Sequence, residues 1–117
     1  MSSTPPLRRL TLVGSLEGDR RAVHTTGFPL DAEQLLPLAD VLLLIGDADG
    51  PGAMLFRYTA HGELGGDTWH PSLEGALDQA SFEYGDAILG WTDIPEDVAD
   101  SHHFAIRVAA ERLDERR

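Results

Sequence analysis

Val41-Leu42-Leu43-Leu44-Ile45 is the longest apolar run in the chain, and a β-branched residue stands at each of its ends. An uninterrupted run of this kind is typical of a central β-strand. Two further apolar stretches follow, Ala53 to Thr59 and Leu64 to Trp69, and each is preceded by a group of turn-forming residues. The three stretches together predict an antiparallel meander.

The residues before this run predict a second pair of strands. Leu7 to Leu16 alternates between apolar and polar side chains, and Arg20 to Thr26 has a similar β-type composition. We therefore expect these two segments to form a hairpin. A short helical segment is expected at Ala32 to Leu36, where Pro37 prevents its clean continuation.

The second half of the chain predicts two helices with a strand between them. Ser72 to Tyr84 carries apolar side chains at helical spacing, and Gly85 is suited to end that helix. Ala87 to Ile94 has the composition of a strand. The last segment, residues 101–115, is predicted to be a helix with Asp100 or Ser101 as its cap, although residues 101–109 also alternate as a strand would.

These elements predict a single α+β domain over residues 7–115, preceded by a flexible leader over residues 1–6. Its antiparallel sheet should contain about five or six strands, from the N-terminal hairpin and the meander. We expect one face of the sheet to be covered by the helix at residues 72–84 and by the C-terminal helix. A chain of 117 residues with 42% apolar and 25% charged content has room for one core and the composition of a globular protein.

Charge is distributed unevenly along the chain. Between Asp31 and Ile106 there are fifteen Asp or Glu residues and one basic residue, Arg57, whereas the other eight arginines lie in the two terminal segments. The net charge of the whole chain is −11. A domain this acidic repels nucleic acid and anionic membranes and attracts cationic proteins, and the attraction weakens as salt rises.

Two missing residue types exclude several kinds of chemistry. The chain has no cysteine, which excludes disulfides, thiolate nucleophiles and cysteine-based zinc sites. It has no lysine, which excludes Schiff-base catalysis and lysine-dependent phosphate loops. No signal peptide or membrane span is apparent. Arginine as the only basic residue type indicates a GC-rich bacterial source, and we expect a cytoplasmic location.

Candidate metal ligands do not form a recognisable motif. Asp47-Ala48-Asp49-Gly50 resembles the start of a calcium loop, but the twelfth position of such a loop would be Tyr58, which supplies no carboxylate. His102 and His103 are adjacent, so their side chains diverge on either a helix or a strand. We therefore predict no metal and no cofactor.

The segment from Gly66 to Ser72 brings Asp67, Trp69 and His70 close together in sequence. It has two interpretations. An aspartate in contact with a histidine can orient and polarise it, as in a small ligand-binding or catalytic pocket. Alternatively, Trp69 is a core aromatic at a strand–helix junction, and the polar residues satisfy backbone groups there.

Acidic residues along the second half are the remaining functional signal, and we expect them to gather on one surface that binds a partner. They are Glu74, Asp78, Glu83, Asp86, Asp93, Glu96 and Asp97. The sequence predicts a small non-catalytic protein that docks a basic protein, as an immunity-type inhibitor or a nucleic-acid mimic does. The alternative is a ligand-binding or enzymatic domain that uses Asp67, Trp69 and His70. No catalytic residue is predicted, and a homo-oligomer is compatible with either function.

Overall fold

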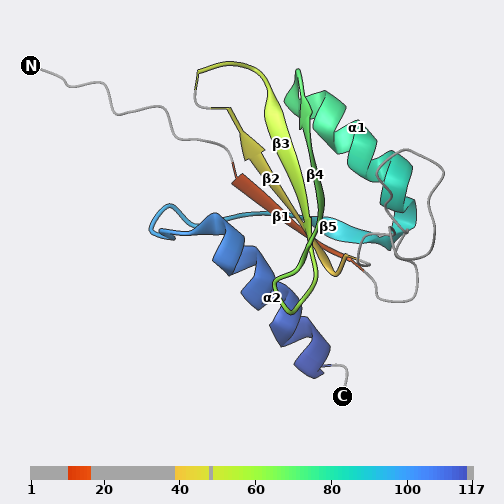
Figure 1. Cartoon of the computed structure of the whole chain (residues 1–117), viewed down its shortest axis with the longest axis vertical. Coiled ribbons are helices and arrows are strands. Elements are labelled where there is room, and N and C mark those ends of the chain that lie inside the picture. The colour runs from red at the N-terminus through yellow and green to blue at the C-terminus, as the bar shows by residue number, and fades with distance from the viewer. Residues whose placement is uncertain (1–10, 17–38, 48, 116–117) are drawn as a thin grey trace, which may run out of the picture.

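The structure is a computed structural model that describes residues 11–16, 39–47 and 49–115. Five strands, two α-helices and one 3-10 turn follow one another along this part of the chain (Figure 1). In order, they are β1 (Thr11–Leu16), β2 (Val41–Gly46), β3 (Ala53–Tyr58), β4 (Leu64–His70), α1 (Leu73–Tyr84), η3 (Gly85–Ala87), β5 (Ile88–Asp93) and α2 (Ser101–Glu115).

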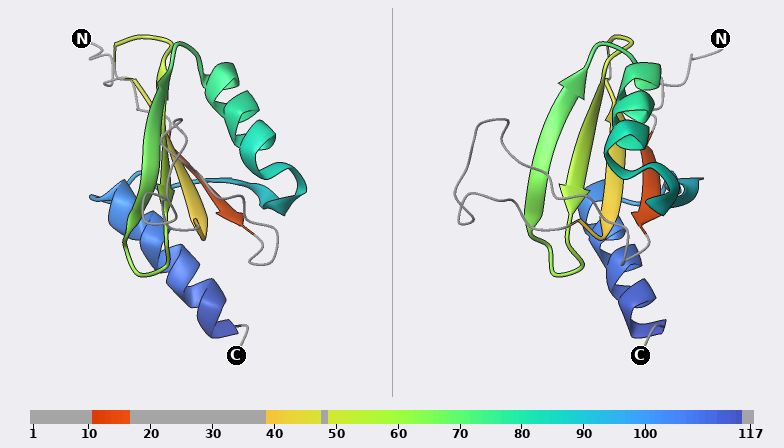
Figure 2. Two further views of the ribbon diagram at one scale, coloured as in Figure 1. Left: turned by 45° about the vertical axis from the view of Figure 1, so that its right-hand side comes forward. Right: turned by 90° about the vertical axis from the view of Figure 1, so that its right-hand side faces the viewer.

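The strands form one sheet in the order β4-β3-β2-β1-β5, and every neighbouring pair is antiparallel. The predicted α+β class and antiparallel sheet are thus confirmed. β2, β3 and β4 form the predicted meander, whereas β5 pairs with β1 at the opposite edge. The chain between β4 and β5 must therefore cross from one edge of the sheet to the other, and α1 makes that crossing (Figure 2).

β1 is the described part of the predicted N-terminal hairpin. It pairs with β2 on one side and with β5 on the other. The expected second strand at Arg20 to Thr26, the helical segment at Ala32 to Leu36 and the leader at residues 1–6 all lie outside the described residues.

The two α-helices lie on opposite faces of the sheet, as Figure 2 shows most clearly in its left view. Val41 and Leu43 belong to the apolar cluster beneath α2, whereas Leu42 and Leu44 belong to the clusters beneath α1. All four side chains are fully buried. The prediction that both helices cover the same face is therefore wrong. Successive side chains of a strand point to opposite faces, so a strand that is apolar at every position needs cover on both.

Small residues bring each helix close to the sheet. Ala76 and Ala80 are buried contacts of α1, next to Tyr84 at its end, and Ala105 and Ala109 are buried contacts of α2. An alanine side chain allows the helix backbone to approach, so the large apolar volume comes from the strands. The core is accordingly three layers thick, with the sheet in the middle.

A side chain caps the start of each helix, and the cap of α2 is one of the two predicted residues. The Ser72 hydroxyl accepts a hydrogen bond from the Gly75 N–H at 3.0 Å. Asp100 Oδ1 accepts one from the His103 N–H at 3.2 Å, which identifies Asp100 as a cap of α2. Gly85, with φ of +49°, ends α1 in the left-handed region that favours glycine. The segment at residues 101–109 is helical, so the choice of helix over strand is confirmed.

No helix in the described part of the chain has the length and apolar character needed to cross a bilayer.

The two-faced burial of β2 predicts that neighbouring leucines are equally important. Leu42→Ala and Leu43→Ala should each lower the free energy of unfolding by about 2–5 kcal/mol, because each leaves a cavity in a different layer. Leu64→Ala is the control: Leu64 on β4 is 45% exposed, so this substitution should lower the free energy of unfolding much less. Urea unfolding of the three variants provides the measurement. If only one of the two core variants were destabilised, one layer would not be packed as described.

Candidate functional site

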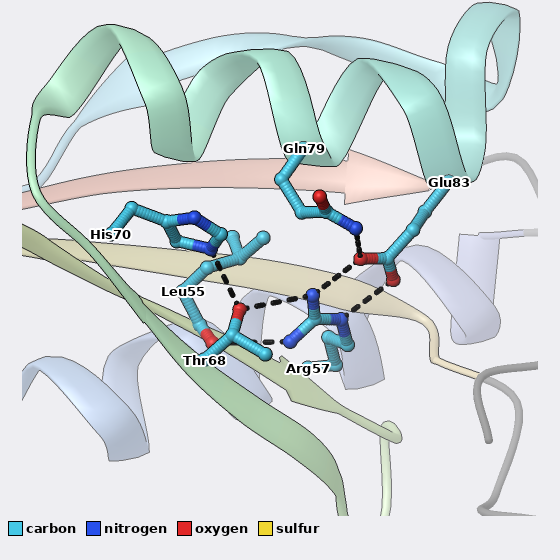
Figure 3. A network of polar contacts seen from close by, with 6 residues as sticks. All are labelled: Leu55, Arg57, Thr68, His70, Gln79 and Glu83. Atoms are coloured by element: carbon cyan, nitrogen blue, oxygen red, sulfur yellow. Dashed lines mark hydrogen bonds and ion pairs between the residues drawn. The ribbon is translucent and has the colours of Figure 1, made fainter. Parts of the chain in front are cut away.

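Arg57, the only basic residue between Asp31 and Ile106, lies inside the protein. It is on β3, is 0% exposed and points toward α1 (Figure 3). Glu83 of α1 meets it with both carboxylate oxygens: Arg57 Nε donates to Oε1 at 2.8 Å and Nη2 to Oε2 at 2.5 Å. This bidentate geometry is the strongest form of arginine–carboxylate contact.

Further hydrogen bonds complete the surroundings of this ion pair. Arg57 Nη1 donates to the Leu55 carbonyl at 3.3 Å, and Nη2 also donates to Thr68 Oγ1 at 3.2 Å. Thr68 Oγ1 lies 2.8 Å from His70 Nε2. On the other side, Gln79 Nε2 donates to Glu83 Oε2 at 2.7 Å. The guanidinium is therefore bonded through all three of its nitrogens, as a buried charge requires.

The pairing changes the role of Glu83. The sequence places it among the acidic residues predicted to bind a partner, but its carboxylate is directed inward and neutralises Arg57. The pair also places Arg57, the one basic residue between Asp31 and Ile106, in the interior and not on the surface. The negative potential of the exposed carboxylates in this segment is consequently not reduced by an arginine of the same segment on the surface.

The outer side of α1 carries a row of three exposed side chains. Glu74, Asp78 and Phe82 follow one another at intervals of four residues, so they lie on the same side of the helix. Phe82 is 86% exposed, more than any other large apolar side chain among the described residues. Asp86 follows in η3 and is also exposed. We call Glu74, Asp78, Phe82 and Asp86 the α1 ridge.

The other predicted partner-binding residues lie elsewhere. Asp93 is the last residue of β5, and Glu96 and Asp97 lie in the connection from β5 to α2. This connection and α1 are on opposite sides of the sheet in Figures 1 and 2. The seven predicted acidic residues thus divide into three on the α1 ridge, three at or beyond the end of β5 and one, Glu83, in the interior.

Asp67, Trp69 and His70 do not form a common corner. Asp67 and Trp69 are opposite Phe56 and Met54 in the sheet, and their side chains share the face that carries α2. His70 is on the other face, where it meets Thr68 beneath α1. Side chains alternate between the two faces of a strand, so His70 and Asp67, three residues apart on β4, point to opposite faces.

An aromatic cluster on the α2 side was missed by the sequence analysis. Tyr58 Oη lies 2.7 Å from His102 Nδ1, and the His102 ring stands edge-on to Phe56 with 4.7 Å between ring centroids. Burial and then the charges of Asp67 and Asp100 raise the pKa of Tyr58 above its ordinary value. The alternation of Phe56 and Tyr58 about Arg57 was the signal available in the sequence.

Within the residues described, no group of three or more His, Asp or Glu side chains is arranged to hold a metal ion. His102 is bonded to Tyr58, while the neighbouring His103 is exposed, so the two diverge as adjacent helical residues do.

Comparison with protein-family models, with curated proteins and with solved structures found no match for this chain. The geometry of these residues is therefore the basis for any functional conclusion.

Tyr84, the last residue of α1, is buried beside the Arg57–Glu83 pair. Its pKa is raised to about 12, chiefly by burial and then by the negative charge of Glu83, while Arg57 acts in the opposite direction. The folded protein therefore holds this phenol neutral at a pH where an unfolded tyrosine, with a pKa near 10, ionises.

The buried ion pair predicts that removing one charge destabilises the fold. Glu83→Gln should lower the free energy of unfolding by about 3–5 kcal/mol, because Arg57 keeps its charge in the interior without a counter-ion. Glu111→Gln is the matched control: its contact with Arg107 is 4.0 Å long and mostly exposed, so the loss should stay below about 0.5 kcal/mol. Similar losses for the two variants in urea unfolding would contradict the burial of the pair.

The raised pKa of Tyr84 predicts a loss of stability in alkali. Below pH 10 the phenol is neutral in both states, and between about pH 10 and 12 only the unfolded state ionises, so stability falls as the pH rises through this window. Tyr84→Phe should therefore lose less stability than the wild type between pH 9 and about pH 11. Phe82→Tyr is the control, since an exposed phenol ionises alike in both states. Equal pH dependence of the wild type and Tyr84→Phe would refute the assignment.

Proposed function

We propose that the chain is a non-catalytic binding protein that docks a positively charged region of another protein on the α1 ridge. The observation that carries this proposal is Phe82, which is 86% exposed on the same side of α1 as Glu74 and Asp78. A large aromatic side chain surrounded by carboxylates has the composition of a binding centre, with an apolar anchor inside a charged rim.

The fold itself does not use Phe82. α1 contacts the sheet through the opposite side of the helix, where Ala76, Ala80 and Tyr84 are buried. Phe82 belongs to none of the three apolar clusters of the described residues. An exposed phenylalanine leaves apolar area in water, and burial against a partner would recover that loss.

The ridge is held rigidly, which favours binding. Glu83 follows Phe82 directly in sequence and fixes the helix to β3 through Arg57. The Ser72 cap holds the first turn. A surface that is ordered before contact loses less conformational entropy when the complex forms.

The charge of the ridge indicates the partner's chemistry. Within the described residues, no arginine forms an ion pair with Glu74, Asp78 or Asp86. A cationic protein surface would be attracted over a distance and would then place its basic groups around Phe82. An immunity-type inhibitor of a basic protein, or a mimic of nucleic acid, matches these properties. The absence of cysteine agrees with action in a reducing bacterial cytoplasm.

Photo-crosslinking in cells of the source organism tests this proposal. A benzoylphenylalanine residue at position 82 should crosslink to one basic protein, and the same residue at position 64 should not, because Leu64 is exposed on β4. In lysate, the yield from position 82 should fall as salt is raised.

Charge-neutral variants show which acidic residues matter. Glu74→Gln combined with Asp78→Asn should reduce the crosslink several-fold, because both changes remove charge from the ridge. Asp49→Asn combined with Asp97→Asn removes the same charge elsewhere and should leave the yield close to that of the wild type. A crosslink that is absent from position 82, or that is reduced equally by the two double variants, would contradict docking on the ridge.

A further inference from the structure

We infer that Trp69, together with Asp47 and Asp67, forms a binding site for the guanidinium group of an arginine side chain from a partner polypeptide. This site lies on the sheet face that carries α2, so it is separate from the α1 ridge and does not depend on the function proposed for that ridge.

The Trp69 ring is held in place on the surface. Its Nε1 donates a hydrogen bond to Asp47 Oδ2 at 3.0 Å. The ring also lies against Gly52, where an added Cβ would be only 2.6 Å from Trp69 Cζ2 and 2.9 Å from Cε2. The Asp47 N–H donates to the Gly52 carbonyl at 2.8 Å, so the indole rests on a closed turn between β2 and β3. The Nε1 side of the indole is thereby fixed.

The held ring remains open to solvent. Trp69 is 57% exposed, and it belongs to none of the apolar clusters within the described residues. The core therefore does not account for the two contacts that fix this indole. A fixed aromatic ring that remains mostly exposed is suited to stacking against a flat ligand group, since little side-chain entropy is lost on binding.

Two carboxylates lie on the same side of the sheet as the ring. Asp47 is at the indole edge, and Asp67 is two residues earlier on β4, so its side chain shares the same face of the sheet. No basic side chain forms an ion pair with either carboxylate in the part of the chain described here. Farther along this face, burial and then the negative charges of Asp67 and Asp100 raise the pKa of Tyr58.

An open indole face beside carboxylates matches guanidinium better than other cations. Guanidinium is planar and weakly hydrated, so it stacks on an aromatic face while its N–H groups donate to carboxylates at the edge. A lysine ammonium is a compact and strongly hydrated charge and gains less from the ring. A trimethylammonium group has no N–H and would leave the carboxylates without donors.

Titration of the full-length protein with hexa-arginine and hexa-lysine peptides tests this site. Both peptides should bind weakly to so acidic a protein, but hexa-arginine should bind about two- to five-fold more tightly because of its stacking on Trp69. The indole N–H resonance of Trp69 in the ¹H–¹⁵N NMR spectrum should move with hexa-arginine and much less with hexa-lysine. Equal affinities together with an unmoved indole resonance would overturn the inference, since they would indicate charge attraction alone.

The two turn glycines supply a matched pair of variants. In Gly52→Ala the added Cβ displaces the indole, so the preference for arginine should be lost. Gly50→Ala should retain the preference, since nothing lies within 4 Å of a Cβ at that position. Asp47→Asn keeps an oxygen that can accept from the indole but removes the charge. This variant and Asp67→Asn should both weaken hexa-arginine binding with the fold intact, which covers the case in which Gly52→Ala fails to fold.

Phe82→Ala separates this site from the α1 ridge. The arginine preference and the movement of the Trp69 resonance should both persist in that variant. Loss of the preference in Phe82→Ala, its persistence in a folded Gly52→Ala variant, or hexa-arginine binding that is undiminished in Asp67→Asn would show that arginine is recognised elsewhere and would overturn the assignment.

Discussion

The ion pair between Arg57 and Glu83 is the contact on which the rest of the molecule depends. A guanidinium that is completely buried must have a counter-ion and a full set of acceptors, because an isolated charge in the interior is too costly. Glu83 supplies the counter-ion from α1, and Leu55 and Thr68 supply further acceptors from β3 and β4. The pair therefore fixes the crossing helix to the sheet and sets which side of that helix faces the solvent.

The second constraint is β2, a strand that is apolar at every position from Val41 to Ile45. Both faces of this strand need apolar cover, so one helix lies on each face of the sheet. The protein therefore has two different exposed surfaces, one on each side of the sheet. The outer side of α1 presents carboxylates around Phe82. The face of β3 and β4 next to α2 presents Trp69 and the aromatic cluster of Tyr58. Both exteriors carry carboxylates, and Arg57, the arginine of β3, is buried against Glu83 and does not offset them; this shared negative charge is why we propose cationic partners for each.

The sequence predicted the elements well because each has a local signature. The strands from Val41 onward and both helices lie close to their expected bounds, since periodicity and caps such as Ser72 and Asp100 depend only on neighbouring residues. Strand alternation could also have separated His70 from Asp67, and helical spacing could have aligned Phe82 with Asp78. The sequence did not reveal that Arg57 meets Glu83, because that contact spans 26 residues and depends on how α1 crosses the sheet. The sequence likewise did not reveal the contact between Trp69 and Gly52, because it joins residues that are distant in the chain.

Hydrogen exchange of the arginine Nε–H groups, followed by NMR, tests the Arg57–Glu83 pair most directly. The chain has nine arginines, and exposed guanidinium groups exchange these protons rapidly with water. The account predicts that Arg57 Nε–H exchanges far more slowly than the Nε–H of Arg107, which is largely exposed, and that the protection disappears in Glu83→Gln. Exchange of Arg57 at the rate of Arg107 in the wild-type protein would contradict the burial of the pair and the placement of α1 that follows from it.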